Sequence, residues 1–323
     1  MPLPDDATAQ VQAELALKRL PLVIAHRGAS AIAPENTLRA LKLAVLLGAD
    51  GVEFDVHLSA DGCPMVIHDR RVDRTTSASG AVSQHTAGEL AKLDAASWFD
   101  RRLAVRPGVR ARVRTALESM DALDWGSAEE GIPTLEAVLR LLSARGLKRI
   151  YIELKGVPET RPALLDEVIR LVRSLNLERT ATLLSFHHDI IRRSAEIAGD
   201  IRTAVNIPAH IRDLPMARSI IRLAQDAGAS EVSLHFSLAS RRLVGALHDQ
   251  GFQVAGWTAN RKIIMRRLAA CGVDSIITNF PDRLRTILQP PPKSGLLSHA
   301  RSQRWVGKTA RRVSPPEEAG RLA

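Results

Sequence analysis

Eight short apolar segments recur between residues 21 and 288, and longer amphipathic stretches separate most of them. These stretches, such as TLRALKLAVLLGA, place apolar residues three and four positions apart, which is the spacing of an amphipathic helix. Continuously apolar strands separated by helices predict a parallel sheet that is covered on both faces. Eight such units predict a closed (β/α)8 TIM barrel, with a doubly wound sheet as the alternative. The predicted strands are 21–26, 51–56, 149–154, 181–186, 202–207, 231–236, 252–257 and 275–280.

The regular alternation is interrupted after the second predicted strand. The pair Asp61-Gly62 is typical of a hairpin turn, and the apolar segment PMVIHD follows it. The second strand should therefore continue into a short β-excursion. The next stretch, about 69–131, contains no convincing buried strand. We therefore expect an inserted subdomain or lid there, rather than a further part of the barrel wall.

The two ends of the chain differ from the predicted barrel domain at 21–288. Residues 1–20 form an extension with acids where a signal peptide needs lysines, and no apolar run is long enough to span a membrane. We therefore expect a cytoplasmic protein. The tail at 289–323 is rich in Pro, Ser and Gly, which predicts disorder.

Half of the net charge of +10 lies in that tail, where seven Lys and Arg residues oppose two Glu residues from position 291 onward. The charge left to the barrel is ordinary for an enzyme with an anionic substrate, so we expect no nucleic-acid partner. Weak contact between the basic tail and a membrane surface is a further hypothesis. The sequence leaves the oligomeric state open.

Three carboxylates occur near the ends of predicted strands, where barrel enzymes place their active sites. Glu53 and Asp55 lie two positions apart in an apolar strand and therefore share one of its faces, and Glu153 ends the next predicted strand. A buried carboxylate costs several kcal/mol unless it is paired or bound to a metal. The set suits one hard divalent cation, Mg²⁺ or Ca²⁺ with Mn²⁺ as a further candidate. Salt bridges to Arg27 and Lys155 are the structural alternative.

Six segments of the chain together resemble the glycerophosphodiester phosphodiesterase family. They occur in the family's order over about residues 21–288, and they are HRGASAIAPENT, GVEFDVHLSADGCPMVIHD, IPTLEAVL, YIELK, GWTAN and GVDSIITNFPD. The resemblance implies a TIM-barrel enzyme that uses a divalent cation to hydrolyse glycerophosphodiesters to glycerol 3-phosphate and an alcohol.

The resemblance also implies roles for individual residues. It assigns catalysis to His26 and His68, metal binding to Glu53, Asp55 and Glu153, and phosphate binding to Arg27 and Lys155. Trp257 and His235, at the ends of later predicted strands, are further candidates for substrate contact, with core packing and capping as their alternatives. We expect Glu35 and Asn36 of the PENT segment to be structural.

General chemistry agrees with this assignment, since an imidazole with a pKa near ~6.5 can remove or deliver a proton close to neutral pH. A hydroxyl beside the phosphorylated carbon of glycerol could attack first and form a cyclic phosphate. For that route we hypothesise His26 as the acid and His68 as the base. Two other functions stay open, a lysophospholipase D acting at membranes and a metal-binding barrel without catalysis.

Overall fold

The computed structural model describes residues 20–99, 131–210 and 216–288. The N-terminal extension, the segment 100–130 of the predicted insertion, and the basic tail lie outside these residues. None of the described helices is long and apolar enough to cross a membrane.

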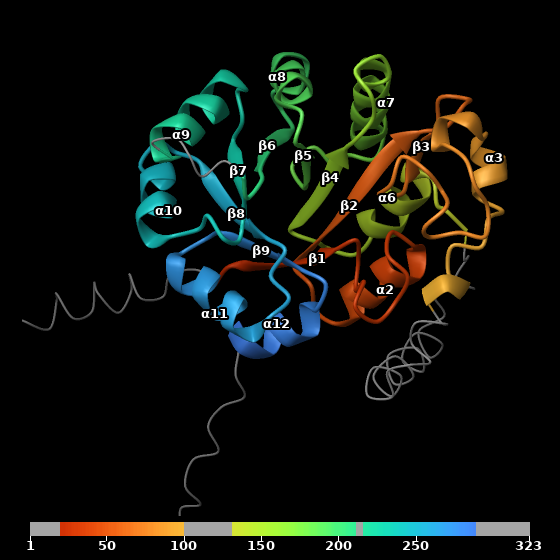
Figure 1. Cartoon of the computed structure of the whole chain (residues 1–323). Helices are drawn as coiled ribbons and strands as arrows, with labels where there is room; N and C mark the ends of the chain where they lie inside the picture. The colour runs from red at the N-terminus through yellow and green to blue at the C-terminus, as the bar shows by residue number, and fades with distance from the viewer. Residues whose placement is uncertain (1–19, 100–130, 211–215, 289–323) are drawn as a thin grey trace, which may run out of the picture. The chain divides into compact units, whose positions relative to one another are not determined.

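Eight parallel strands form a closed barrel (Figure 1). Each strand pairs in parallel with its neighbours, and β1 pairs with both β2 and β9, which closes the sheet. The predicted (β/α)8 barrel is therefore confirmed, and the doubly wound alternative is wrong. The strands are β1 (Leu22–His26), β2 (Gly51–Leu58), β4 (Arg149–Leu154), β5 (Ala181–Ser185), β6 (Arg202–Ile207), β7 (Glu231–His235), β8 (Gln253–Trp257) and β9 (Ser275–Thr278).

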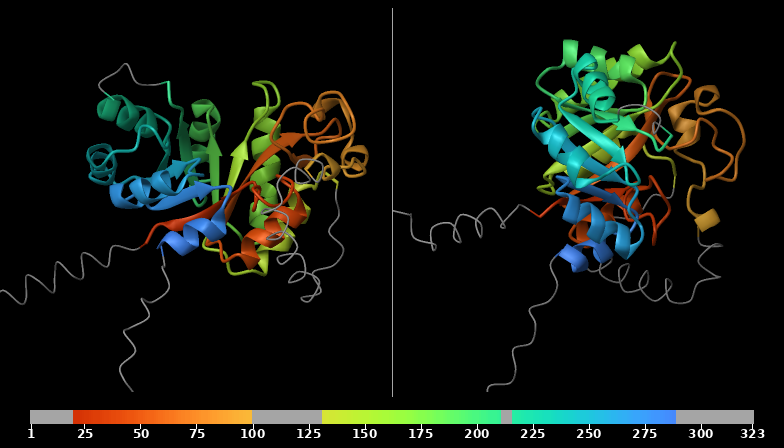
Figure 2. Two further views of the ribbon diagram at one scale, coloured as in Figure 1. Left: turned by 60° about the horizontal axis from the view of Figure 1, so that its bottom comes forward. Right: turned by 60° about the vertical axis from the view of Figure 1, so that its left-hand side comes forward.

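Helices surround the barrel on its outer side (Figures 1 and 2). Several begin at a Ser or Thr whose hydroxyl accepts a hydrogen bond from a backbone N–H of the first turn, as Thr37, Thr134 and Ser240 do. The helices are α2 (Leu38–Leu46), α6 (Leu135–Ser143), α7 (Arg161–Ser174), α8 (His188–Ile197), α9 (Met216–Asp226), α10 (Arg241–His248), α11 (Lys262–Cys271) and α12 (Pro281–Leu288).

The strands divide their side chains between two cores. In β2, Phe54 and Val56 belong to the large core between the strands and the helices. The alternating residues Glu53 and Asp55 therefore point into the barrel. The barrel interior has its own apolar cluster, which includes Ile24, Tyr151, Leu184, Ala204, Ala255 and Ile277.

The β-excursion after β2 is confirmed, because β3 (Pro64–Val66) pairs antiparallel with the end of β2. The described part of the insertion that follows contains the short helices η1 (Val82–Gln84) and α3 (Ala87–Leu90). It packs around a small core separate from the barrel, made of Met65, Ile67, Val72, Val82, Leu90, Ala95 and Ile132.

Candidate active site at the carboxyl ends of the barrel strands

The register of the parallel strands brings the candidate carboxylates together. His26 of β1 is the partner of Glu53 in β2, and Asp55 is the partner of Glu153 in β4. Carboxylate oxygens of the three acidic residues lie within 4.8 Å of one another, and all three side chains are buried. This arrangement makes an all-oxygen ligand set suited to a hard divalent cation.

Asp55 is the best compensated of the three carboxylates. Its Oδ1 lies 3.0 Å from Lys155 Nζ, and its Oδ2 lies 3.1 Å from Arg27 Nε and accepts a hydrogen bond from Asn36 Nδ2 at 3.0 Å. Burial opposes ionisation, but Lys155 and Arg27 outweigh it and hold the pKa of Asp55 well below its usual range.

The two glutamates differ from Asp55 in their electrostatics. Burial, followed by the charges of Asp55 and Glu153, raises the pKa of Glu53 well above its usual range. Burial also raises the pKa of Glu153 to about 7, although its carboxylate is paired with Lys155. The Glu53 carboxylate lies 3.2 Å from the Arg27 backbone nitrogen, which donates to it, and 3.8 Å from His26 Nε2.

Salt bridges therefore account for Asp55 and Glu153 but leave Glu53 without a paired Lys or Arg side chain in the described part of the chain. A divalent cation would supply the missing positive charge. The three carboxylates thus fit a divalent metal better than they fit salt bridges alone.

Each candidate catalytic histidine is oriented through its Nδ1 atom. His26 Nδ1 lies 2.7 Å from Asn279 Oδ1, and His68 Nδ1 lies 2.6 Å from Asp69 Oδ1. Because oxygen atoms accept hydrogen bonds, Nδ1 of each ring is the donor, and Nε2 carries the lone pair of the neutral ring. Burial, with Arg27 second, lowers the pKa of His26 to about 4, and burial also lowers the pKa of His68.

A chain of charged hydrogen bonds connects His68 to the carboxylates. Asp69 accepts from Arg74 Nε, and Arg74 Nη2 donates to Glu35 Oε1 at 2.7 Å. Glu35 Oε1 also accepts from Arg27 Nη1 at 2.8 Å. Glu35 and Asn36 were expected to be structural, yet both contact residues of the candidate site.

The loop after β1 needs unusual backbone conformations to make these contacts. Arg27 and Asn36 have φ angles of 57° and 61°, in the left-handed region that residues other than glycine rarely adopt. Gly28 has a φ of 77°, and a Cβ atom there would lie 2.5 Å from the Ala40 carbonyl carbon. Only glycine fits both conditions, which explains the HRG sequence in local terms.

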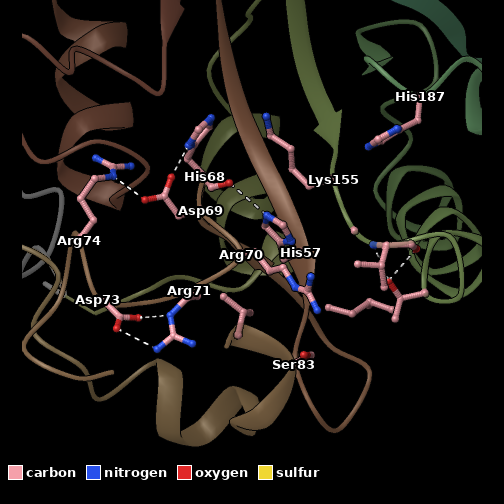
Figure 3. Close-up of a pocket in the computed structure, with 15 residues that line it drawn as sticks. His57, His68, Asp69, Arg70, Arg71, Asp73, Arg74, Ser83, Lys155 and His187 are labelled. Carbon is pink, nitrogen blue, oxygen red and sulfur yellow. Dashed lines mark hydrogen bonds and ion pairs between the residues drawn. The ribbon is translucent and has the colours of Figure 1, made fainter. Parts of the chain in front are cut away.

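Two hollows adjoin this cluster. The smaller, with a volume of about 150 Å³, is lined by His26, Glu53, Glu153 and the apolar side chains of Leu184, Phe186, Trp257 and Ile277. The larger has a volume of about 640 Å³, and Figure 3 shows the residues that line it. His68 and Lys155 line both hollows, so the two meet at these side chains.

The two remaining candidates lie in different places. Trp257 lines the smaller cavity, and its Nε1 donates to the Ser233 carbonyl oxygen at 3.0 Å. His235 is not among the residues that line that cavity; its Nδ1 lies 2.8 Å from Ser237 Oγ, and its ring packs 5.3 Å from the Trp257 ring. The structure therefore places Trp257 at the site, whereas His235 packs against the Trp257 ring.

Comparison with known proteins gives matches over most of the chain. The family model of glycerophosphoryl diester phosphodiesterases matches residues 26–283. The YhdW protein of Bacillus subtilis strain 168 is 36% identical over 264 residues, which cover 80% of this chain and 95% of that protein. A glycerophosphodiester phosphodiesterase of Caldanaerobacter subterraneus subsp. tengcongensis is 32% identical over 271 residues, which cover 83% of this chain and 98% of the relative.

A solved structure is similar over a comparable length. A phosphodiesterase of Oleispira antarctica, in complex with the product sn-glycerol-3-phosphate, has 25% sequence identity and a TM-score of 0.67. The match covers 84% of this chain and 98% of that chain.

Proposed function

Since the chain belongs to the glycerophosphoryl diester phosphodiesterase family, we propose that it hydrolyses glycerophosphodiesters with one divalent cation and two catalytic histidines. The products would be glycerol 3-phosphate and an alcohol, and the Oleispira antarctica relative binds the first of these. The observation that carries the metal-dependent mechanism is the convergence of three buried carboxylates beside His26.

Glu53, Asp55 and Glu153 would hold the cation, which we take to be Mg²⁺ or Ca²⁺, with Mn²⁺ as a further candidate. When bound, it would offset negative charge that develops on the phosphoryl oxygens. Arg27 and Lys155 would contribute to the same stabilisation, because both cationic groups lie within 3.1 Å of the Asp55 carboxylate at the centre of the cluster.

The two hollows suggest how the substrate lies. A water-sized group occupies about 30 Å³, so the cavity of about 150 Å³ takes about five such groups, which suits a glycerol unit. Its apolar wall, including Trp257 and Phe186, would cover the carbon atoms of glycerol. The leaving alcohol would then extend from the phosphate into the larger hollow beyond His68 and Lys155.

This placement of the substrate gives each histidine its own proton-transfer role. His26, inside the glycerol cavity, would remove the proton from the hydroxyl beside the phosphorylated carbon as that hydroxyl attacks phosphorus. His68, between the two hollows, would protonate the alcohol oxygen as it leaves. Water activated by His68 would then open the cyclic phosphate, and His26 would return the proton to glycerol. The geometry thus favours the opposite division from the one suggested by the sequence alone.

The purified protein tests the proposal on glycerophosphocholine, glycerophosphoethanolamine and lysophospholipids, with and without EDTA. We expect glycerol 3-phosphate from the soluble diesters and loss of turnover in EDTA. Faster turnover of lysophospholipids would instead support the lysophospholipase D alternative, and binding of a cation without any turnover would support a non-catalytic barrel.

A single substitution separates the metal from plain salt bridges. Glu53→Gln should keep the fold, because the side chain keeps its size, but should weaken divalent-cation binding measured by calorimetry and lower turnover with it. Unchanged cation affinity in this variant would remove Glu53 from the ligand set.

A further inference from the structure

The larger hollow has a chemical character that the hydrolysis of simple diesters does not require. We call it the excursion groove, because the end of β2 and the insertion form one side of it and the loop between β4 and α7 forms the other. Its volume of about 640 Å³ is roughly four times that of the glycerol cavity. Figure 3 shows three arginines of the insertion at this groove, namely Arg70, Arg71 and Arg74.

Two of these arginines are already paired with carboxylates. Arg71 donates to both oxygens of Asp73 at 3.0 Å, and Arg74 donates to Asp69 (Figure 3). Arg74 also donates to Glu35. Both acids among the described lining residues are therefore offset by an arginine, which weakens their attraction for a cationic headgroup such as choline.

Arg70 differs from its neighbours. Its side chain is exposed, and within the described residues it forms no ion pair; its carbonyl oxygen accepts the Val82 backbone N–H at 2.9 Å. Among its described lining residues the groove thus contains one uncompensated guanidinium, together with the imidazoles of His57 and His187. A planar guanidinium with free donors is the side chain best suited to bind phosphate.

We propose that the excursion groove binds the leaving alcohol and, through Arg70, favours alcohols that carry a further anionic group such as a second phosphate. The inference rests on the proposed function, because the groove adjoins the scissile phosphate only if that phosphate lies at His68 and Lys155. Both of these side chains line the groove and the glycerol cavity, so one substrate can occupy both.

The experiment compares two pairs of substrates that differ in charge on the leaving alcohol. One pair is glycerophosphoinositol and glycerophosphoinositol 4-phosphate; the other is glycerophosphoglycerol and 1,3-bis(glycerophospho)glycerol. For the parent enzyme, kcat/KM should be higher for the more anionic member, and the ratio should fall as salt is added. Arg70→Gln should lower that ratio by about 1.4- to fivefold, the range of one exposed ion pair. The loss should be in KM, because this contact is present before and during the reaction.

A matched variant controls for the loss of one positive charge. Arg266 of α11 is exposed and does not line the groove, so Arg266→Gln should leave the ratio unchanged. Melting curves of both variants should coincide with that of the parent.

Three outcomes distinguish the two proposals. An unchanged ratio in Arg70→Gln, with neutral diesters still hydrolysed, overturns the role of Arg70 alone. A preference of the parent for glycerophosphocholine over every anionic substrate overturns it as well. Failure to hydrolyse any diester in the presence of Mg²⁺, Ca²⁺ or Mn²⁺ overturns the proposed function and, with it, this inference.

Discussion

Replacing Asp69 with asparagine should slow the enzyme while leaving it folded. Asp69 Oδ1 lies 2.6 Å from His68 Nδ1, and this carboxylate both fixes the ring tautomer and favours the protonated ring that a general acid needs. An amide in its place has no charge, and its NH₂ group can favour the wrong tautomer. Arg74 would keep its two hydrogen bonds to Glu35, so the loop should stay in place.

The size of the effect follows from the lost charge. A hydrogen bond to a charged group contributes about 1.5–3 kcal/mol, and about 1.36 kcal/mol corresponds to a tenfold change in rate. Complete loss would therefore slow the reaction by about 10- to 150-fold. Because 30% of the Asp69 side chain is exposed and solvent screens it, we expect kcat/KM for release of the alcohol to fall by about 10- to 50-fold.

The assay measures kcat/KM for release of the alcohol from two glycerophosphodiesters, one with an alkyl leaving group and one with a nitrophenyl leaving group. This quantity covers only the steps up to departure of the alcohol, so it excludes the later opening of the cyclic phosphate that both substrates share. If His68 protonates the leaving oxygen, the defect of Asp69→Asn should be large on the alkyl substrate and small on the nitrophenyl substrate, whose alcohol leaves without a proton. Asp73→Asn is the matched control, because Asp73 lies in the same groove but pairs with Arg71 instead of His68.

Two results would refute the reasoning. An equal defect on both substrates would mean that His68 does not act as the acid. Full activity of Asp69→Asn on both would mean that the carboxylate does not position His68 for catalysis at all.

Three further predictions concern other parts of the chain. Asn36→Ala removes the hydrogen bond to Asp55 and should weaken divalent-cation binding by about tenfold or more in calorimetry; unchanged binding would show that Asn36 does not position this ligand. The pKa of Asp50 is lowered, against burial, by the Val23 backbone N–H and two basic side chains, so its stabilising effect is present above pH ~4 and is lost as the pH falls further. Asp50→Asn should therefore cost about 1 kcal/mol in denaturant unfolding at pH 7 and little near pH 3, whereas a constant difference would exclude the linkage. Deletion of 291–323 should leave turnover of soluble diesters nearly unchanged and should weaken salt-dependent binding to anionic vesicles; equal vesicle binding would exclude membrane contact by the tail.

Much of the fold could be predicted because its signals are local. All eight barrel strands lie at the predicted segments, and the Asp61-Gly62 turn leads into the predicted excursion. Side chains alternate along a strand, so the two-residue spacing of Glu53 and Asp55 was enough to place both on one face. Phe54 between them packs in the outer core, as that alternation requires.

The hydrogen bonds that orient the side chains of the site could not be predicted from the spacing of residues in the sequence. Asn279 is 253 positions from His26, and the left-handed conformation that brings Asn36 to Asp55 is held by backbone contacts after β1. The end of a strand likewise did not indicate which residue faces the cavity, since Trp257 lines it and His235 packs against Trp257.

The physical reason for this division is the range of the interactions. Strand and helix periodicity depends on neighbours a few residues apart, so the sequence by itself determined the barrel and the face that carries the acids. Loop conformations, histidine tautomers and the separation of a glycerol cavity from the excursion groove depend on partners far along the chain. Only closure of the barrel, where β1 meets β9 and β2, brings those partners within hydrogen-bonding distance.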